Sequence, residues 1–205
     1  MIISTVTEGE MTKTIELLKK IKVVCGRRDA QDAAKVFFGV QPGDSIMYGV
    51  HNKKFVEETF KEFSLLNPSF EIRNVGKSGY RTKGWETAVY FNSRLVSGKL
   101  LDDYIDEIKS DTPTTKGSII QGKFYGFPNC CVEAFASSDV SRIFVITEEM
   151  LRKRYEEPEL SNPFRNHSEQ FNGKYVEHVP CKKYCFETSR LAEKYKPILD
   201  FVDVI

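Results

Sequence analysis

Apolar residues recur every three or four positions in several stretches of the chain, which is the spacing of an amphipathic helix. The clearest case starts at Lys53, where Phe60, Phe63 and Leu66 share one face and Asn67-Pro68 ends the run. The same spacing, with caps and stops that fit it, predicts four helices in the first half of the chain: Glu10–Val24, Asp29–Val40, Lys53–Asn67 and Gly98–Ser110.

Shorter apolar stretches predict extended segments. Ser69–Val75 and Glu86–Asn92 are typical of strands, and the Gly-rich segment between them predicts a hairpin with a long loop. Ile46–His51 is a further strand candidate, and Ser118–Phe127 is predicted to be short and extended. From Pro128 onward the predicted elements are mostly helical: Asn129 onward, Thr147–Glu157, and Pro180 to about Tyr195.

These elements predict an α+β fold in which a small sheet is accompanied by several helices. A chain of 205 residues suits one compact domain, so we expect a single domain over residues 1–205. A soft boundary near residues 111–117 separates a mixed α/β part from a mostly helical C-terminal part that carries a cluster of cysteine and histidine residues.

Charge and apolar content narrow the function classes only a little. The 30 basic residues nearly cancel the 29 acidic ones, so net charge provides no drive toward nucleic acid or an anionic membrane, and the partners stay unknown. The chain has no secretory signal pattern and no apolar run of roughly 20 residues, which predicts a cytoplasmic protein without a membrane span. Abundant Lys and Glu lean toward a thermophilic source.

Four of the five cysteines lie in two short groups, each preceded by a proline. Cys130 and Cys131 follow Pro128-Asn129, a good helix start, and thiols in a first helical turn have a lowered pKa and bind metals better. Cys181 and Cys185 follow Pro180 and are four residues apart, which predicts one face of a helix that begins there.

His178, just before that second group, adds a fifth soft ligand. Thiolates and imidazole in this number are typical of a zinc site, and the four cysteines alone would suit a [4Fe-4S] cluster. We therefore predict a metal centre of Cys130, Cys131, His178, Cys181 and Cys185, with the metal undecided. A disulfide or redox pair and inert core thiols are the alternatives. Cys25 stands alone in an apolar run and is predicted to be core.

The two cysteine groups resemble a largely archaeal family known as domain of unknown function 483. Its members carry Gly-(Tyr/Phe)-Pro-x-Cys-Cys-x-x-x-Phe and then Pro-Cys-x-x-x-Cys with a Ser soon after. The matching segments are Gly126–Phe135 and Pro180–Ser189, within the C-terminal part of the chain. The resemblance implies a shared cysteine site and brings no known reaction.

A second feature is the basic loop Gly76–Trp85, which combines Lys77, Arg81 and Lys83 with glycines and aromatics. Such a loop can hold phosphate or stack on bases, although a solvated hairpin loop is the commoner case and the sequence is not a Walker A motif. Three hypotheses follow: a protein with a Cys/His metal centre, an enzyme of thiol or sulfur chemistry that uses an activated Cys130 or Cys131, and an RNA- or nucleotide-binding accessory protein that uses this loop. Whether the protein is an enzyme stays open.

Overall fold

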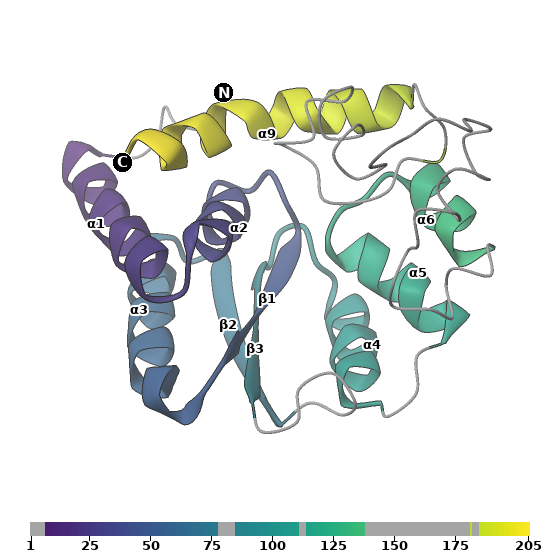
Figure 1. Cartoon of the computed structure of the whole chain (residues 1–205), viewed down its shortest axis with the longest axis horizontal. Coiled ribbons are helices and arrows are strands. Elements are labelled where there is room, and N and C mark those ends of the chain that lie inside the picture. Colours follow the sequence, from purple (N-terminus) through teal and green to yellow (C-terminus); the bar gives the residue numbers. More distant parts are fainter. Residues whose placement is uncertain (1–6, 78–84, 111–113, 138–180, 182–184) are drawn as a thin grey trace, which may run out of the picture. The chain divides into compact units, whose positions relative to one another are not determined.

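A computed structural model describes residues 7–77, 85–110, 114–137, 181 and 185–205 (Figure 1). The chain forms two compact units, each described by itself below. The first comprises residues 1–112, 124–126 and 198–205, and the second comprises residues 113–123 and 127–197. The prediction of a single domain stays a prediction. The helices and the small antiparallel sheet confirm the predicted α+β class.

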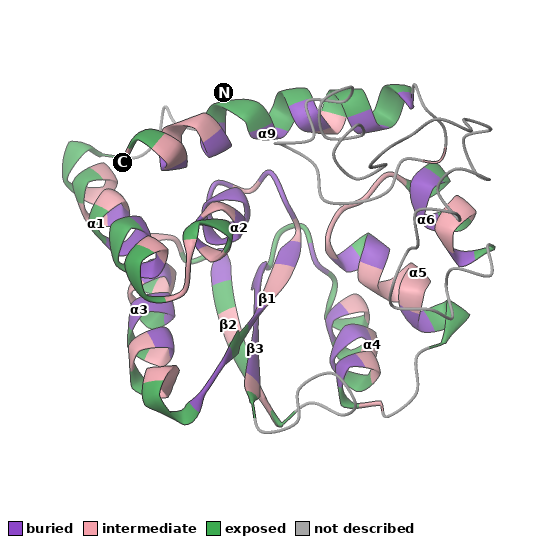
Figure 2. Ribbon diagram, in the orientation of Figure 1, coloured by how far each residue is buried: buried purple, intermediate pink, exposed green. Residues whose placement is uncertain are grey.

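The first unit contains a three-stranded antiparallel sheet in the order β1-β3-β2. The strands are β1 (Gly43–Tyr48), β2 (Phe70–Lys77) and β3 (Glu86–Asn92). The predicted hairpin is therefore confirmed, since β2 and β3 pair directly with a register shift between Asn74 and Gly76. The central strand β3 is buried along almost its whole length, which indicates that both of its faces are covered (Figure 2).

Four helices accompany this sheet in the first unit: α1 (Glu8–Val24), α2 (Arg27–Phe37), α3 (Lys53–Leu66) and α4 (Gly98–Lys109), with a short 3-10 turn at Val50–Asn52. The helices α2 and α3 contact the strands, and α1 packs on α2 and α3. The core between α3 and the sheet is aromatic, because Phe60 and Phe70 both contact the Tyr90 ring at centroid distances of 4.8 and 5.8 Å. Burial of these large aromatic side chains stabilises this unit.

Helix boundaries in this unit mostly follow the prediction, with one correction. The second helix spans Arg27–Phe37 after Gly26, so it begins and ends earlier than the predicted Asp29–Val40. In α1 the buried face contains Leu17, Leu18 and Ile21, whereas Val24 at the end of the helix is 40% exposed. The helix α1 itself is confirmed, and a reciprocal capping box between Thr7 and Glu10 fixes its start.

The predicted extended segment Ser118–Phe127 is wrong, because Thr115–Phe124 forms the helix α5. The Thr114 hydroxyl accepts the backbone N–H of Gly117 at 2.8 Å, which is the bond of an N-cap residue to the third helical position. The Thr114 carbonyl also accepts the Ser118 N–H at 3.0 Å. This cap outweighs the strand preference of the neighbouring isoleucines. A left-handed Gly126, with φ of +75°, then turns the chain after the helix.

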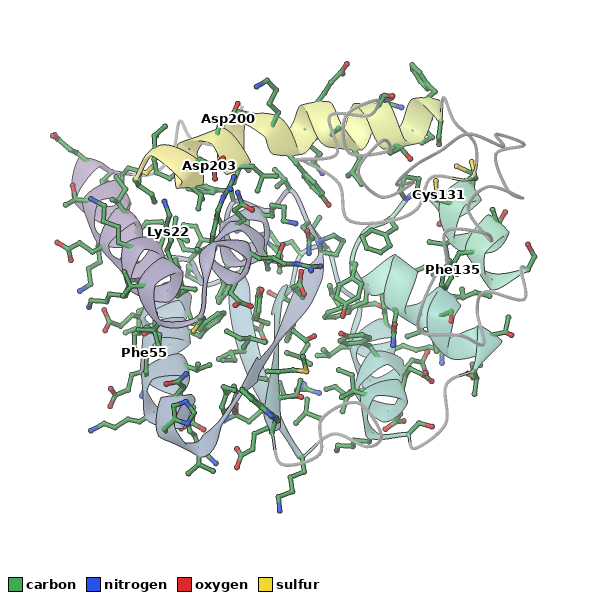
Figure 3. The ribbon with its side chains drawn as sticks, in the orientation of Figure 1. Lys22, Phe55, Cys131, Phe135, Asp200 and Asp203 are labelled. Carbon is green, nitrogen blue, oxygen red and sulfur yellow. The ribbon has the colours of Figure 1, made fainter. Side chains whose placement is uncertain are left out.

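The last turns of α9 (Phe186–Val204) belong to the first unit and are held there by charged side chains. Lys22 Nζ donates to the carbonyls of Val202 and Asp203 at 3.1 and 3.3 Å, where a cation complements the helix C-terminus. Arg27 donates twice to the Asp203 carboxylate, at 2.7 and 2.6 Å. Figure 3 labels Lys22 and Asp203 on these neighbouring helices. Among the residues described, no helix has the length and apolar character to cross a bilayer.

Candidate metal centre

The first pair of thiols stands at the start of α6 (Asn129–Ala136), in the second unit. The predicted start at Asn129 is confirmed, but Asn129 does not cap the helix. Pro128 precedes the helix as its N-cap residue, with extended backbone and no side-chain cap. Its carbonyl accepts the N–H groups of Cys131 and Val132 at 2.9 and 3.0 Å. Cys130 and Cys131 therefore occupy the first turn, as predicted.

The helix α6 packs closely against α5 within the second unit. A Cβ at Gly122 of α5 would lie 2.5 Å from Val132 Cγ2, which is closer than real Cβ atoms approach other heavy atoms. Gly122 also accepts the Phe127 N–H at 2.8 Å. Only glycine at this position lets the two helices come together without displacing Val132, so α5 positions the helix that carries Cys130 and Cys131.

The second pair is arranged differently from the prediction. The helix α9 begins at Phe186, not at Pro180, so Cys181 and Cys185 do not share a helical face. The Cys185 carbonyl accepts the Ser189 N–H at 3.1 Å, which is the first helical hydrogen bond and makes Cys185 the residue at the helix start. The chain thus places the Cys185 thiol at an N-terminal end, where unpaired N–H groups favour negative charge.

The four thiols converge on one point. The Sγ atom of Cys185 lies 3.7 Å from that of Cys130 and 3.6 Å from that of Cys131, and the two adjacent cysteines are 3.9 Å apart. With Cys181 included, all four Sγ atoms lie within 4.8 Å of one another. Figure 3 labels Cys131 at the start of α6, where these sulfurs gather. Such a group of four cysteines could hold a metal ion.

Burial differs sharply within this cluster. Cys131 and Cys185 are both 2% exposed, Cys181 is half-buried and Cys130 is exposed. All five cysteines of the chain are free thiols. Two non-sulfur groups lie within hydrogen-bond distance of the buried Cys131 sulfur: the Thr188 hydroxyl at 3.4 Å, and the Cys181 backbone N–H, which donates at 3.3 Å. Thr188 is itself fully buried. Hydrogen bonds of this kind orient thiolate ligands and stabilise their charge.

The pKa values of these thiols are set by opposing effects. Burial raises the pKa of Cys131 well above its usual value and outweighs the hydrogen bonds from Thr188 and Cys181, so the predicted lowering of its pKa by the helix start is wrong for the metal-free thiol. Burial, together with side-chain hydrogen bonds to Cys185 and Cys130, raises the pKa of Cys181 to about 11. Burial also acts to raise the pKa of Cys185. Hydrogen bonds from the Thr188 hydroxyl and N–H and from the neighbouring thiols outweigh this effect and lower the pKa of Cys185 to about 7.

The remaining predicted site residues do not join this cluster in the described part of the chain. His178, Arg81 and Lys83 lie outside the described residues, and Lys77 is exposed at the end of β2. Cys25, predicted to be core, is only half-buried. The functional residue that the sequence analysis missed is Thr188, whose position three residues after Cys185 would have indicated it once the true start of α9 was known.

Comparison with models of protein families, with curated proteins and with solved structures finds no match to this chain. The resemblance to domain of unknown function 483 therefore stays a prediction. The cysteine cluster is the feature on which a functional argument has to rest.

Proposed function

We propose that Cys130, Cys131, Cys181 and Cys185 bind a single zinc ion that joins the start of α6 to the start of α9. The observation that carries the proposal is the spacing of the sulfurs. Zinc binds thiolates at about 2.3 Å in a tetrahedron, whose edge is then about 3.8 Å. Three of the Sγ–Sγ separations, 3.6, 3.7 and 3.9 Å, are close to that edge.

The same spacing favours one ion over a [4Fe-4S] cluster. In such a cluster each thiolate binds a different iron, so the inorganic core separates the four sulfurs. A single ion needs all four sulfurs around one point, and here none is more than 4.8 Å from another. The zinc set is complete with four cysteines, so the proposal does not use His178 as a ligand.

The surroundings of the sulfurs also suit a bound cation. Four thiols packed together would lose protons on binding zinc, and the excess negative charge of the four thiolates needs donors around it. The Thr188 hydroxyl and the Cys181 N–H, both directed at Cys131, are such donors. A closed set of four protein ligands is typical of structural zinc, which contributes directly to folding. The zinc ion would then hold the second unit together.

Elemental analysis of protein purified without oxygen tests this proposal, together with X-ray absorption at the zinc edge. We expect one zinc per chain with four sulfur neighbours at about 2.3 Å. Cys185→Ser is expected to lose the ion, whereas Cys25→Ser and His178→Ala are expected to keep it. A brown protein with several irons per chain would mean that the cysteines hold an iron–sulfur cluster and not zinc. A colourless protein without metal would refute the proposal.

A further inference from the structure

The four cysteines of the cluster differ in their exposure to solvent. Cys131 and Cys185 are each 2% exposed, so no reagent reaches their sulfurs without opening the site. Cys181 is half-buried. Cys130, in the first turn of α6, is exposed. This difference in exposure separates Cys130 from the other three cysteines.

Hydrogen bonding also distinguishes Cys130 from Cys131. The Cys131 sulfur has the Thr188 hydroxyl at 3.4 Å and the Cys181 N–H at 3.3 Å. Within the described ranges, the contacts of Cys130 Sγ are with other cysteine sulfurs, at 3.9 Å from Cys131 and 3.7 Å from Cys185. Donors aimed at a thiolate hold its lone pairs and lower its nucleophilicity. Among the described residues, Cys130 Sγ thus has sulfur neighbours in place of N–H or O–H donors, and its lone pairs stay available.

We propose that Cys130 is the reactive sulfur of the centre and accepts an alkyl group from soft alkyl electrophiles. The inference rests on the proposed zinc site, since a bound cation keeps the sulfur as a thiolate at neutral pH. In the step, a lone pair of Cys130 Sγ attacks the electrophilic carbon of an alkyl halide and forms a carbon–sulfur bond. The carbon–halogen bond breaks, and the halide leaves with its electron pair. No electrons are gained or lost overall, so no oxidant or reductant is required.

The product has a defined consequence for the site. Alkylation converts the Cys130 thiolate into a neutral thioether and removes one negative charge from the ligand set. Cys131, Cys181 and Cys185 keep their thiolates, and two of these are buried. Three protein ligands with a fourth, weaker position is the arrangement in which zinc exchanges ligands. The modification would therefore weaken zinc retention without unfolding the chain at once.

Methylation of the zinc-loaded full chain by methyl iodide, without oxygen and at neutral pH, tests the inference. Zinc content is read before the reagent is added, and peptide mass spectrometry then locates the methyl group over time. We expect Cys130 to be methylated first, and about tenfold or more faster than Cys131, which is the factor that one hydrogen bond to a charged acceptor corresponds to. Zinc transfer to a chelator should rise in step with methylation.

Two serine variants complete the test. Cys130→Ser should lose the fast methylation, whereas Cys25→Ser, which lies outside the cluster, should keep it. Bound zinc with Cys181 methylated first, or with no cysteine methylated, overturns this inference and leaves the zinc proposal intact. A chain without zinc overturns both. Methylation mapped on the unmodified sequence distinguishes Cys130 from Cys181 even if neither variant folds.

Discussion

Removal of zinc is expected to lower the free energy of unfolding by about 4 kcal/mol. The proposed ion links Cys131 to Cys181, which are 50 residues apart in the chain. The loop-closure relation used for covalent cross-links gives about 4 kcal/mol at 25 °C for a loop of that length. For a chain of this size, 1 kcal/mol shifts the melting temperature by about 2–4 °C, so the stripped protein should melt about 8–16 °C lower.

The assay is thermal and guanidinium unfolding followed by far-UV circular dichroism, on zinc-loaded and chelator-stripped protein. Reducing conditions are essential, because stripped sulfurs 3.6 Å apart are close enough to form a disulfide that would restore the link. Cys25→Ser is the matched control, since Cys25 lies in the first unit and outside the cluster. Added free zinc should restore stability by about 1.4 kcal/mol per tenfold excess over the dissociation constant.

Stripped and loaded proteins that unfold within about 1 kcal/mol of each other would refute the stabilising link, because that difference is well below the loop-closure figure. A loss of stability in Cys25→Ser as large as that in Cys185→Ser would refute it as well. A loss confined to one of two separate transitions supports it, because only the second unit contains the cysteine cluster.

Three further predictions follow from packing and titration. Gly43→Ala should lower the free energy of unfolding by about 1–3 kcal/mol in guanidinium titration, because the new Cβ would lie 2.6 Å from Cε1 of the fully buried Phe124. Gly122→Ala should speed zinc loss to a chelator, because its Cβ would push Val132 and the first turn of α6 out of place. Cys25 should react slowly with iodoacetamide at pH 8 and faster as pH rises, because burial and the nearby Asp29 charge raise its pKa to about 11.

Each of these has its own control. A Cβ at Gly98, at the start of α4, would meet no other atom within 4 Å, so Gly98→Ala should leave the free energy of unfolding unchanged or slightly higher. A loss of stability in Gly98→Ala equal to that in Gly43→Ala would contradict the packing argument. Unchanged zinc release in Gly122→Ala would mean that α5 does not position α6. Fast alkylation of Cys25 at pH 8 would mean that its environment is less apolar than the structure indicates.

The sequence predicts helices and strands well where the apolar residues follow one clear period and no other local signal favours a different structure. In α3 the apolar residues Val56, Phe60 and Phe63 follow the helical period, and all three are fully buried. The prediction for the α5 segment is wrong because its adjacent isoleucines favour extended structure locally, while the decisive bond comes from a Thr114 side chain outside the apolar run. A single N-cap hydrogen bond outweighs the strand propensity of two residues, and the spacing of apolar residues alone does not reveal such a cap.

For the site, the cysteine spacing predicts which side chains gather but not how. Two proline-led pairs predict convergence, and Cys130, Cys131, Cys181 and Cys185 do converge. The prediction that Cys181 and Cys185 share one face of a helix is wrong because it assumes that the helix starts at Pro180. The actual start after Cys185 changes that residue from a side-chain ligand on a helical face into one at the helix end, and makes Thr188 a donor to the cluster. Such a partner depends on helix register, which composition and spacing do not determine.

Two adjacent cysteines, Cys130 and Cys131, give the cluster a combination of ligands that neither cysteine could supply alone. Neighbouring residues on a helix point about 100° apart, so two consecutive cysteines at a helix start differ in how far they are buried. Here Cys131 is buried and has hydrogen-bond donors around its sulfur, while Cys130 is exposed, yet both sulfurs lie in the same cluster. One helix turn thereby supplies a protected ligand and an accessible one to a single centre. A purely structural clip would be served as well by two buried ligands, so the exposed member of the pair is the residue whose chemistry should be measured.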